Sequence, residues 1–488
     1  MRIRSEDRGV LYDIASYFTF KTPGYFFMPA YRNGTWDGTI RLFNTRTQTM
    51  PRGLLHRLAR FCMDRGHELD FSAVDSMEPR QEKLSVEEAE LYLRSLNPTY
   101  KGAPLEPHKH QIDALSHTIT HGRSVLLSPT SSGKSLVIYA LARWHAEEKG
   151  RRVLIIVPNI GLVSQLAGDF LDYSSADGWA DGNCQLIMEG KSKEIDNQVV
   201  ISTWQSIYKL DRAWFRQFDA VIGDEAHHFK AKSLVEIMGK AERAFHRTAT
   251  TGTLDGTQVH RLVIEGEFGP VHSVTTTKEL MDNDIVSLLS IKAILLEHPQ
   301  ATIKAAKGLK YHEEMEFLCK SNRRTEFIVN LASGLKGNTL VLYQFVGMHG
   351  EELHRRIQEA CPGRKVFFIH GDVVSEDRMT AREEMENSDD CIIVASYQTF
   401  ATGISIRKLH NVVFASPFKS EIRLRQSIGR QLRKHPDKKK AMLFDIGDIL
   451  CDDPRKAKVN YTLEHFRHRI DAYKSEGFDY TIGKVRLC

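Results

Sequence analysis

The amino-acid sequence predicts an α/β protein in which two tandem parallel-sheet domains follow a small α/β accessory domain. Short and nearly continuous apolar runs alternate with helix-like segments from Pro107 onward, in two successive series. Such runs are typical of parallel strands that are covered on both faces. The length of 488 residues and the apolar content of 41% suffice for about three folded domains.

Residues 1–97 are predicted to form the accessory domain. Their first part combines many aromatic side chains with lysines and arginines. The Asn-Gly pair at residues 33–34 is typical of a hairpin turn, so we expect strands at 25–32 and 35–43. The aromatic and basic residues either contact DNA, by stacking on bases and binding phosphates, or form the core of the hairpin, and both interpretations stay open.

Two helices are expected in the accessory domain, one at residues 54–62 and one that begins after Ser85. Ser85 and Glu88 match a capping box. Residues 98–107 contain three prolines and a glycine and are expected to be the linker into the first sheet domain. The second helix is expected to bury Val86, Ala89, Leu93 and Leu96 on one face.

The two sheet domains are expected at residues 98–289 and 290–458, with a helical tail at 459–488. The predicted strands of the first domain are 125–127, 153–157, 185–188, 199–202, 220–223 and 247–250. Those of the second domain are 339–343, 366–369, 391–395, 411–415 and 441–445. The tail is expected to contain a helix at 463–473 and a short final strand.

The segment SPTSSGKS at residues 128–135 lies between a predicted strand and a helix-like run, which is the context of a phosphate-binding loop. Backbone N–H groups and the helix dipole converge there on an anion. Lys134 is expected to reach the β and γ phosphates of ATP, and the Ser135 hydroxyl to bind Mg²⁺. An ordinary serine-rich turn is the disfavoured alternative. We expect ATP contacts from Thr130, Ser131, Ser132, Gly133, Lys134 and Ser135.

The segment Asp224-Glu225-Ala226-His227 follows the predicted strand 220–223. Ligands of such folds bind at the carboxyl ends of the strands, so these carboxylates are expected to face the phosphate loop. Asp224 is expected to hold Mg²⁺, and Glu225 to orient and deprotonate the attacking water. A solvated acidic turn is the alternative.

The segment QSIGRQLR at residues 426–433 lies in the second sheet domain. Helical spacing would place Arg430 and Arg433 on one face. Two guanidinium groups can stabilise charge on a transferring γ-phosphoryl group. A basic surface helix is the alternative interpretation.

Two basic stretches indicate a polyanionic partner. Residues 1–60 contain ten Lys/Arg and four Asp/Glu, and residues 407–440 contain eleven and two, although the whole chain has a net charge of only +5. The seven cysteines are scattered without zinc-type spacing, which indicates a reducing compartment and no structural metal. The N-terminus lacks an apolar signal segment, so a cytoplasmic protein without a membrane partner is expected. We also expect the protein to be monomeric or weakly associating.

These motifs resemble those of superfamily 2 helicases, and the chain resembles more closely the UvsW-type recombination helicases of tailed phages. The resemblance implies two RecA-like domains. It rests also on the segments 34–38, 107–108, 157–158, 203–205, 394–397 and 402–405.

The resemblance implies roles for further residues. Gln111 would read the nucleotide, and Gly403 would touch ATP. Coupling between hydrolysis and domain movement falls to His227, Thr251, Thr253 and Gln426. Contacts with the nucleic-acid backbone fall to Asn159, Thr203 and Thr402.

The expected function is ATP-driven closure of two domains that moves the protein along DNA. The family resemblance implies branched DNA as substrate, including Holliday junctions, stalled forks and R-loops, with duplex, single-stranded and RNA–DNA hybrid segments. Two alternatives remain open. One is a duplex translocase or RNA helicase that does not migrate junctions, and the other is an annealing protein with a regulatory ATPase.

Overall fold

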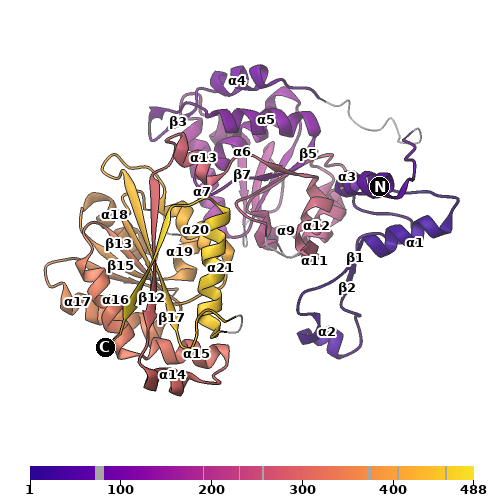
Figure 1. Cartoon of the computed structure of the whole chain (residues 1–488). Coiled ribbons are helices and arrows are strands. Elements are labelled where there is room, and N and C mark those ends of the chain that lie inside the picture. Colours follow the sequence, from indigo (N-terminus) through magenta and orange to yellow (C-terminus); the bar gives the residue numbers. More distant parts are fainter. Residues whose placement is uncertain are drawn as a thin grey trace. The chain divides into compact units, whose positions relative to one another are not determined.

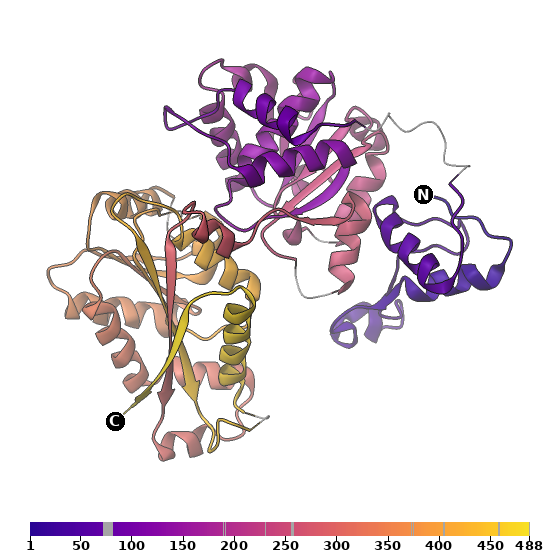
Figure 2. The ribbon, with the colours of Figure 1, turned by 45° about the horizontal axis from the view of Figure 1, so that its top comes forward.

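The computed structural model describes residues 1–71, 82–188, 190, 192–229, 231–254, 258–371, 373, 375–403, 406–456 and 459–487. It contains two compact units, residues 1–128 with 133–275 and residues 129–132 with 276–488 (Figures 1 and 2). Within the described ranges, none of the helices has the length and apolar character needed to cross a bilayer.

The first unit contains a seven-stranded, all-parallel sheet with the order β11-β5-β10-β9-β6-β8-β7. Every predicted strand of this domain overlaps an observed one, and β11 was not predicted. The elements are α4 (Val86–Ser95), β3 (Thr99–Tyr100), β4 (Ala103–Pro104), α5 (Lys109–His121), β5 (Arg123–Leu127), α6 (Lys134–Arg143), η3 (Trp144–Glu148), β6 (Val153–Val157), α7 (Ile160–Tyr173), α8 (Trp179–Asn183), β7 (Cys184–Ile187), β8 (Val199–Thr203), α9 (Trp204–Ile207), α10 (Arg212–Phe215), β9 (Ala220–Gly223), η4 (Ala226–His228), α11 (Ala231–Lys240), β10 (His246–Thr251), α12 (Gln258–Phe268) and β11 (Val271–Ser273).

Alternate residues of each strand enter cores on opposite faces of the sheet. In β6, Val153, Ile155 and Val157 pack with the α4–α7 side, whereas Leu154 and Ile156 pack with the α9–α12 side. Figures 1 and 2 show helices on both sides. This double cover explains the uninterrupted apolar runs in the sequence.

The helix α4 belongs to the core of the first sheet domain, in contrast to the boundary expected at residue 97. Its capping box between Ser85 and Glu88 is present. Ala89 and Leu93 are buried in that core, whereas Val86, expected on the same face, is 40% exposed. The expected linker forms a small β3–β4 hairpin, in which Thr99 Oγ1 donates to the backbone of α7.

The accessory domain pairs different strands from those that the sequence predicts. A short hairpin joins Thr19–Lys21 to Thr39–Arg41, and residues 25–32 form helical turns. Pro29 stands at the first position of α2, where proline favours a helix, and the Asn-Gly pair ends that helix instead of turning a hairpin. The elements are α1 (Arg8–Tyr17), β1 (Thr19–Lys21), η1 (Tyr25–Phe27), α2 (Pro29–Arg32), β2 (Thr39–Arg41), η2 (Arg52–Leu54) and α3 (Leu55–Arg65).

The accessory domain packs on α12 of the first sheet domain. Arg57 donates to both carboxylate oxygens of Glu265 at 2.5 and 2.8 Å. Burial raises the pKa of Glu265, but hydrogen bonds from His56, Arg57 and Arg261 lower it to about 2. A Cβ at Gly53 would collide with the carbonyl oxygen of Glu265, so only glycine permits this close approach.

The second unit contains another seven-stranded, all-parallel sheet, with the order β14-β15-β13-β16-β17-β12-β18. The predicted α/β class is therefore confirmed. The elements are α13 (Thr277–Asp282), β12 (Leu288–Glu297), α14 (Gln300–Ala306), α15 (Tyr311–Cys319), α16 (Asn322–Gly334), β13 (Thr339–Tyr343), η5 (Val346–Gly350), α17 (Glu351–Ala360), β14 (Val366–Ile369), α18 (Ser375–Asn387), β15 (Ile392–Ser396), α19 (Tyr397–Gly403), β16 (Asn411–Phe414), α20 (Glu421–Gln431), β17 (Lys440–Ile449), α21 (Tyr461–Ser475) and β18 (Tyr480–Arg486).

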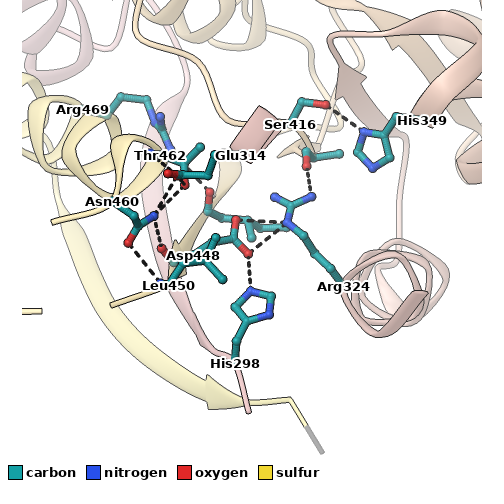
Figure 3. A network of polar contacts seen from close by, with 12 residues as sticks. His298, Glu314, Arg324, His349, Ser416, Asp448, Leu450, Asn460, Thr462 and Arg469 are labelled. Atoms are coloured by element: carbon teal, nitrogen blue, oxygen red, sulfur yellow. Dashed lines mark hydrogen bonds and ion pairs between the residues drawn. The ribbon is translucent and has the colours of Figure 1, made fainter. Parts of the chain in front are cut away.

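The C-terminal tail is an integral part of this second sheet domain. Its strand β18 pairs along β12, which the sequence analysis missed. Glu314 accepts hydrogen bonds from the backbone and hydroxyl of Thr462 at 2.8 and 2.6 Å, at the N-terminus of α21 (Figure 3). Farther along α21, the buried Arg469 binds Asp445 of β17.

A buried polar network joins α16 to the carboxyl ends of β16 and β17 (Figure 3). Arg324 Nε donates to both oxygens of Asp448 at 3.0 Å, and its Nη1 donates to Ala415 O at 2.7 Å. His298 Nε2 lies 2.9 Å from Asp448. Burial raises the pKa of Asp448, but Arg324 and His298 hold it below its ordinary value.

Replacing Arg324 with alanine is expected to lower the free energy of unfolding by about 3–5 kcal/mol, because the buried charge of Asp448 would lose its guanidinium partner. Chemical unfolding of the full chain measures this loss. Arg323, the exposed neighbour on the same helix, supplies the matched alanine control, which should cost less than about 0.5 kcal/mol. Equal effects of the two substitutions would contradict the role of the pair.

Candidate ATPase site

Three neighbouring parallel strands bring the predicted catalytic segments to one edge of the first sheet. The phosphate loop follows β5, Asp224 follows β9, and β10 lies hydrogen-bonded between these two strands. The backbone of Ser128 donates to Thr251 O at the end of β10. The carboxyl edge of a parallel sheet is the usual place of a ligand site in such folds.

The phosphate loop is shaped by two residues in the left-handed backbone region. Ser131 has a φ of 71°, and Gly133 has a φ of 78° at the start of α6. Ser128, which stands where such loops usually have a first glycine, is not among the residues with positive φ. A serine is therefore tolerated at that position, and the loop still directs its amides and the α6 N-terminus toward one point.

Lys134 and Glu225 lie opposite each other at the loop. Lys134 Nζ donates to Ser128 O at 3.2 Å and lies 3.6 Å from Glu225 Oε1. Glu225 has a φ of 47°, which is unusual for a residue other than glycine and typical of strain that a functional site retains. The predicted lysine and glutamate thus share one site.

Asp224 lies half-buried directly beside Glu225. Burial raises the pKa of Asp224 to about 6, and the charge of Glu225 adds to the rise, whereas Lys134 and a hydrogen bond from Thr250 oppose it. Carboxylate and hydroxyl oxygens are the ligands that Mg²⁺ prefers. Asp224 and Ser135 therefore offer the kinds of ligand that would hold a magnesium ion.

His227 connects the acidic segment to the end of β10. The Thr251 hydroxyl donates to Thr253 O at 2.6 Å, so its oxygen is left to accept from His227 Nδ1, 2.8 Å away. Burial lowers the pKa of His227 to about 4, so the ring is neutral. Its Nδ1 also lies 3.4 Å from Glu225 Oε2. Three of the four residues predicted to couple hydrolysis to movement, His227, Thr251 and Thr253, therefore form one chain of contacts with the predicted base.

Gln111 packs against the phosphate loop. Its Oε1 accepts from the backbone of His108 at 2.8 Å, and its Nε2 lies 3.4 Å from Gly133 O. A Cβ at Gly133 would collide with this amide. Gln111 thus supports the loop in addition to the nucleotide contact that the resemblance implies.

Two positioning residues were missed by the sequence analysis. Thr250 donates to Asp224 from the neighbouring strand, and Tyr173 OH lies 2.7 Å from Ser135 Oγ. The role of Thr250 could have been predicted, because Thr250 ends the predicted strand 247–250 and directly precedes Thr251, which was a candidate site residue. No sequence spacing indicates the contact between Tyr173 and Ser135, because Tyr173 is the last residue of α7 and lies 38 positions after Ser135.

Replacing Tyr173 with phenylalanine is expected to raise the Mg²⁺ concentration for half-maximal ATPase by about tenfold, the range seen when a partner of a metal ligand is removed. The pKa of the buried Tyr173 is raised, so its hydroxyl stays neutral and can accept a hydrogen bond from the Ser135 hydroxyl. A magnesium titration at saturating ATP measures the shift. The control is Tyr461→Phe on the exposed end of α21, and an unchanged Mg²⁺ requirement in Tyr173→Phe would contradict this role.

The second unit carries the predicted arginines on and after α20. Arg430 lies on the helix, with its guanidinium 5.8 Å from the centre of the Phe400 ring. Arg433 lies beyond the helix end, so the expected shared helical face is wrong. The helix ends at Gln431. The buried side chain of this residue donates to the backbone of His410 and Met442, at the two strands that precede and follow the helix. Gln426 is half-buried on α20.

The residues predicted to contact nucleic acid are placed at helix ends. Asn159 caps α7 by accepting from Leu162 N at 3.0 Å. The side chain of Thr203 is buried and caps α9 by accepting from Ser206 N, so the surface of this segment is formed by neighbours such as the exposed Gln205. Thr402 and Gly403 form the end of α19, and residues 404–405 of the same motif lie outside the described residues.

Three known families match successive parts of the chain. Residues 2–72 match "DNA helicase UvsW, N-terminal", residues 104–254 match "Type III restriction enzyme, res subunit", and residues 322–435 match "Helicase conserved C-terminal domain".

Individual relatives extend this finding to the full chain. The chain is 33% identical over 501 residues to the ATP-dependent DNA helicase uvsW of Enterobacteria phage T4, with 100% of this chain and 98% of that protein covered. The crystal structure of T4 UvsW aligns with a TM-score of 0.52 at 31% identity, over 100% of this chain and 97% of that chain. A probable helicase D10 of Escherichia phage T5 is 24% identical over 330 residues, which are 64% of this chain and 65% of that protein.

Two parallel-sheet domains of this kind, the first with its phosphate loop beside an Asp-Glu-Ala-His segment, are the hallmark of superfamily 2 helicases. The full-length match to the T4 protein shows that the chain belongs to the UvsW family within that class.

Proposed function

We propose that this protein is an ATP-dependent DNA helicase that unwinds and branch-migrates branched DNA in phage recombination, repair and replication. Its substrates are Holliday junctions, stalled forks and R-loops. The observation that carries the proposal is the gathering of Lys134, Asp224 and Glu225 at one edge of the first sheet, in a chain of the UvsW family. The T4 relative is itself named an ATP-dependent DNA helicase.

In the proposed hydrolysis, Lys134 binds the β and γ phosphates, and Glu225 accepts a proton from the attacking water. His227 contacts the far oxygen of Glu225, so a change at this carboxylate is transmitted to Thr251 and Thr253. Ser135 and Asp224 would hold magnesium, which would supply positive charge to the phosphates. Thr130, Ser131, Ser132 and Gly133 provide the surrounding loop.

The second sheet domain is proposed to complete the reaction. Arg430 and Arg433 stabilise charge on the transferring γ-phosphoryl, Gln426 couples that contact to movement, and Gly403 touches ATP. Asn159, Thr402 and the segment of Thr203 hold the DNA backbone, and this hold should weaken with salt. Repeated closing and opening of the two domains then becomes movement along DNA.

A panel of substrates tests the proposed function. ATPase and strand displacement are measured on matched Holliday junctions, forks, R-loops, linear duplexes and RNA duplexes. The proposal predicts ATP-dependent product from the three branched DNAs. Product from RNA duplexes alone, or movement on duplex without junction migration, would support the first alternative. Annealing at equal rates with and without ATP would support the second.

The proposed setting is the cytoplasm of the infected host, with the protein acting as a monomer or a weakly associating species. We shorten the accessory domain from the expected residues 1–97 to residues 1–71, and we place the start of the first motor domain before α4, because that helix packs in the motor core. The second motor domain extends through β18.

A further inference from the structure

The accessory domain contains a basic hollow of about 900 Å³ between α1 and the β1–β2 hairpin. Among the described residues that line it, the charged side chains are all basic: Lys21, Arg41 and Arg46. Tyr12 stands on the α1 wall and is 70% exposed. The remaining lining is mainly small and polar, with serine, threonine and asparagine side chains. Such a surface suits a flexible polyanion that carries flat apolar groups.

An exposed aromatic tip, defined here as residues 25–31, connects the two strands of this hairpin. Phe26 is 52% exposed and Phe27 66%, and their ring centres are 4.2 Å apart. Met28 and Tyr31 are also exposed. Figure 1 shows α2, which forms part of the tip, at the end of the hairpin remote from α1. A cluster of large apolar side chains in water indicates a contact surface.

The tip is held in place by contacts at its base. Thr22 N donates to Gly38 O at 2.9 Å, and Trp36 Nε1 donates to Thr39 O at 2.8 Å. The Tyr25 ring lies so close to Gly38 that a Cβ there would collide with it. Lys21 Nζ lies 5.0 Å from the centre of the same ring. The basic hollow and the exposed rings are therefore joined by an ordered segment.

Nucleic acid is chemically more complementary to both the hollow and the tip than a protein partner is. Phosphates match the basic lining, and unpaired bases offer π-faces to exposed aromatic rings without regard to sequence. An end of a duplex, where one strand leaves the other, presents both features side by side. An apolar protein segment would match the tip but would bring no anionic groups to the basic lining, where Arg41 is already paired with Asp37.

We propose that the hollow binds the phosphodiester backbone of a displaced DNA strand, and that Phe26 and Phe27 stack on the last base pair of the duplex and keep the strands apart. This inference rests on the proposed helicase function. It gives the accessory domain the role of the strand-separating element.

Three variants of the full chain test the inference. The tip variant is Phe26→Ser with Phe27→Ser, and the hollow variant is Tyr12→Ala with Arg46→Ala. The matched control is Arg60→Ala with Met63→Ser on α3, where both side chains are highly exposed but lie outside the hollow. All six positions are exposed, and thermal melting verifies that each variant is folded.

The tip variant is expected to lose at least tenfold in fork unwinding, while its ATPase at saturating single-stranded DNA stays within twofold of wild type. The hollow variant is expected to bind a fluorescein-labelled single strand of DNA at least fivefold more weakly, and this binding should depend less on salt concentration. The control should match wild type in every assay. With wild-type protein, 2-aminopurine at the fork junction should change its fluorescence, and the tip variant should abolish that change.

Wild-type unwinding by the tip variant, or an unchanged 2-aminopurine signal with wild-type protein, would overturn the inference. A tip variant that unwinds normally but loses self-association in sedimentation would identify an interface between copies instead. These outcomes leave the proposed function intact, because wild-type protein would still unwind the fork. Failure of the wild-type protein to hydrolyse ATP on any DNA would instead overturn the proposed function itself.

Discussion

Replacing Lys134 with alanine is expected to reduce DNA-stimulated ATP hydrolysis by about 10²- to 10³-fold or more, the loss seen when one preorganised electrostatic group is removed from an active site. Lys134 lies between Ser128 O and Glu225, so its ammonium group is preorganised at the phosphate loop. The substitution removes the mobile cation at the β and γ phosphates and leaves the backbone of the loop in place. Steady-state ATPase with forked DNA measures the effect.

Binding of forked DNA by the Lys134 variant should remain within about twofold of wild type in the absence of nucleotide, because DNA contacts are assigned elsewhere. Lys109→Ala is the matched control, since this lysine on α5 is 84% exposed and should leave turnover unchanged. Retention of turnover in Lys134→Ala would remove the loop from the catalytic site.

Replacing Arg430 with alanine is expected to lower kcat by about 10³-fold, the lower part of the range for arginines that stabilise a transferring phosphoryl group. The change should appear in kcat while the affinity for a fluorescent ATP analogue changes little, because the charge that the arginine meets is largest in the transition state. Single-turnover hydrolysis and equilibrium binding separate the two effects.

Arg355→Ala on α17 serves as the control for Arg430, because this arginine is exposed and pairs with glutamates of its own helix. Arg433→Lys is informative beside it, since Arg433 lies after the helix end instead of on the face of Arg430. An Arg430→Ala protein with normal kcat would show that Arg430 does not take part in hydrolysis.

The elements that the sequence predicted well are those with a strong local signal. A buried parallel strand such as 153–157 is apolar at every position because both of its faces are covered. The catalytic segments follow such strands directly, so the topology of a parallel sheet was sufficient to bring Lys134 and Glu225 together. The capping box at Ser85 is likewise a local feature, and it is present in the structure as predicted.

The errors arose where distant contacts decide the outcome. Pro29 starts the helix α2, and the Asn-Gly pair that follows residue 32 ends this helix. The pair therefore marks the end of a helix and not the turn of a hairpin. Tertiary packing placed α4 in the motor core, and pairing with β12 brought β18 into the second sheet. Tyr173 reaches Ser135 only because α7 crosses α6, which sequence spacing does not reveal.

We propose that ATP turnover at this site drives exchange of DNA strands at a junction. A labelled, mobile Holliday junction tests this coupling with wild-type protein and with Glu225→Gln, each with and without ATP. Only wild-type protein with ATP is expected to convert the junction into duplex products, while Glu225→Gln binds the junction and leaves it unchanged. Conversion at the wild-type rate by Glu225→Gln, or by wild-type protein without ATP, would show that junction migration does not depend on ATP turnover at this site.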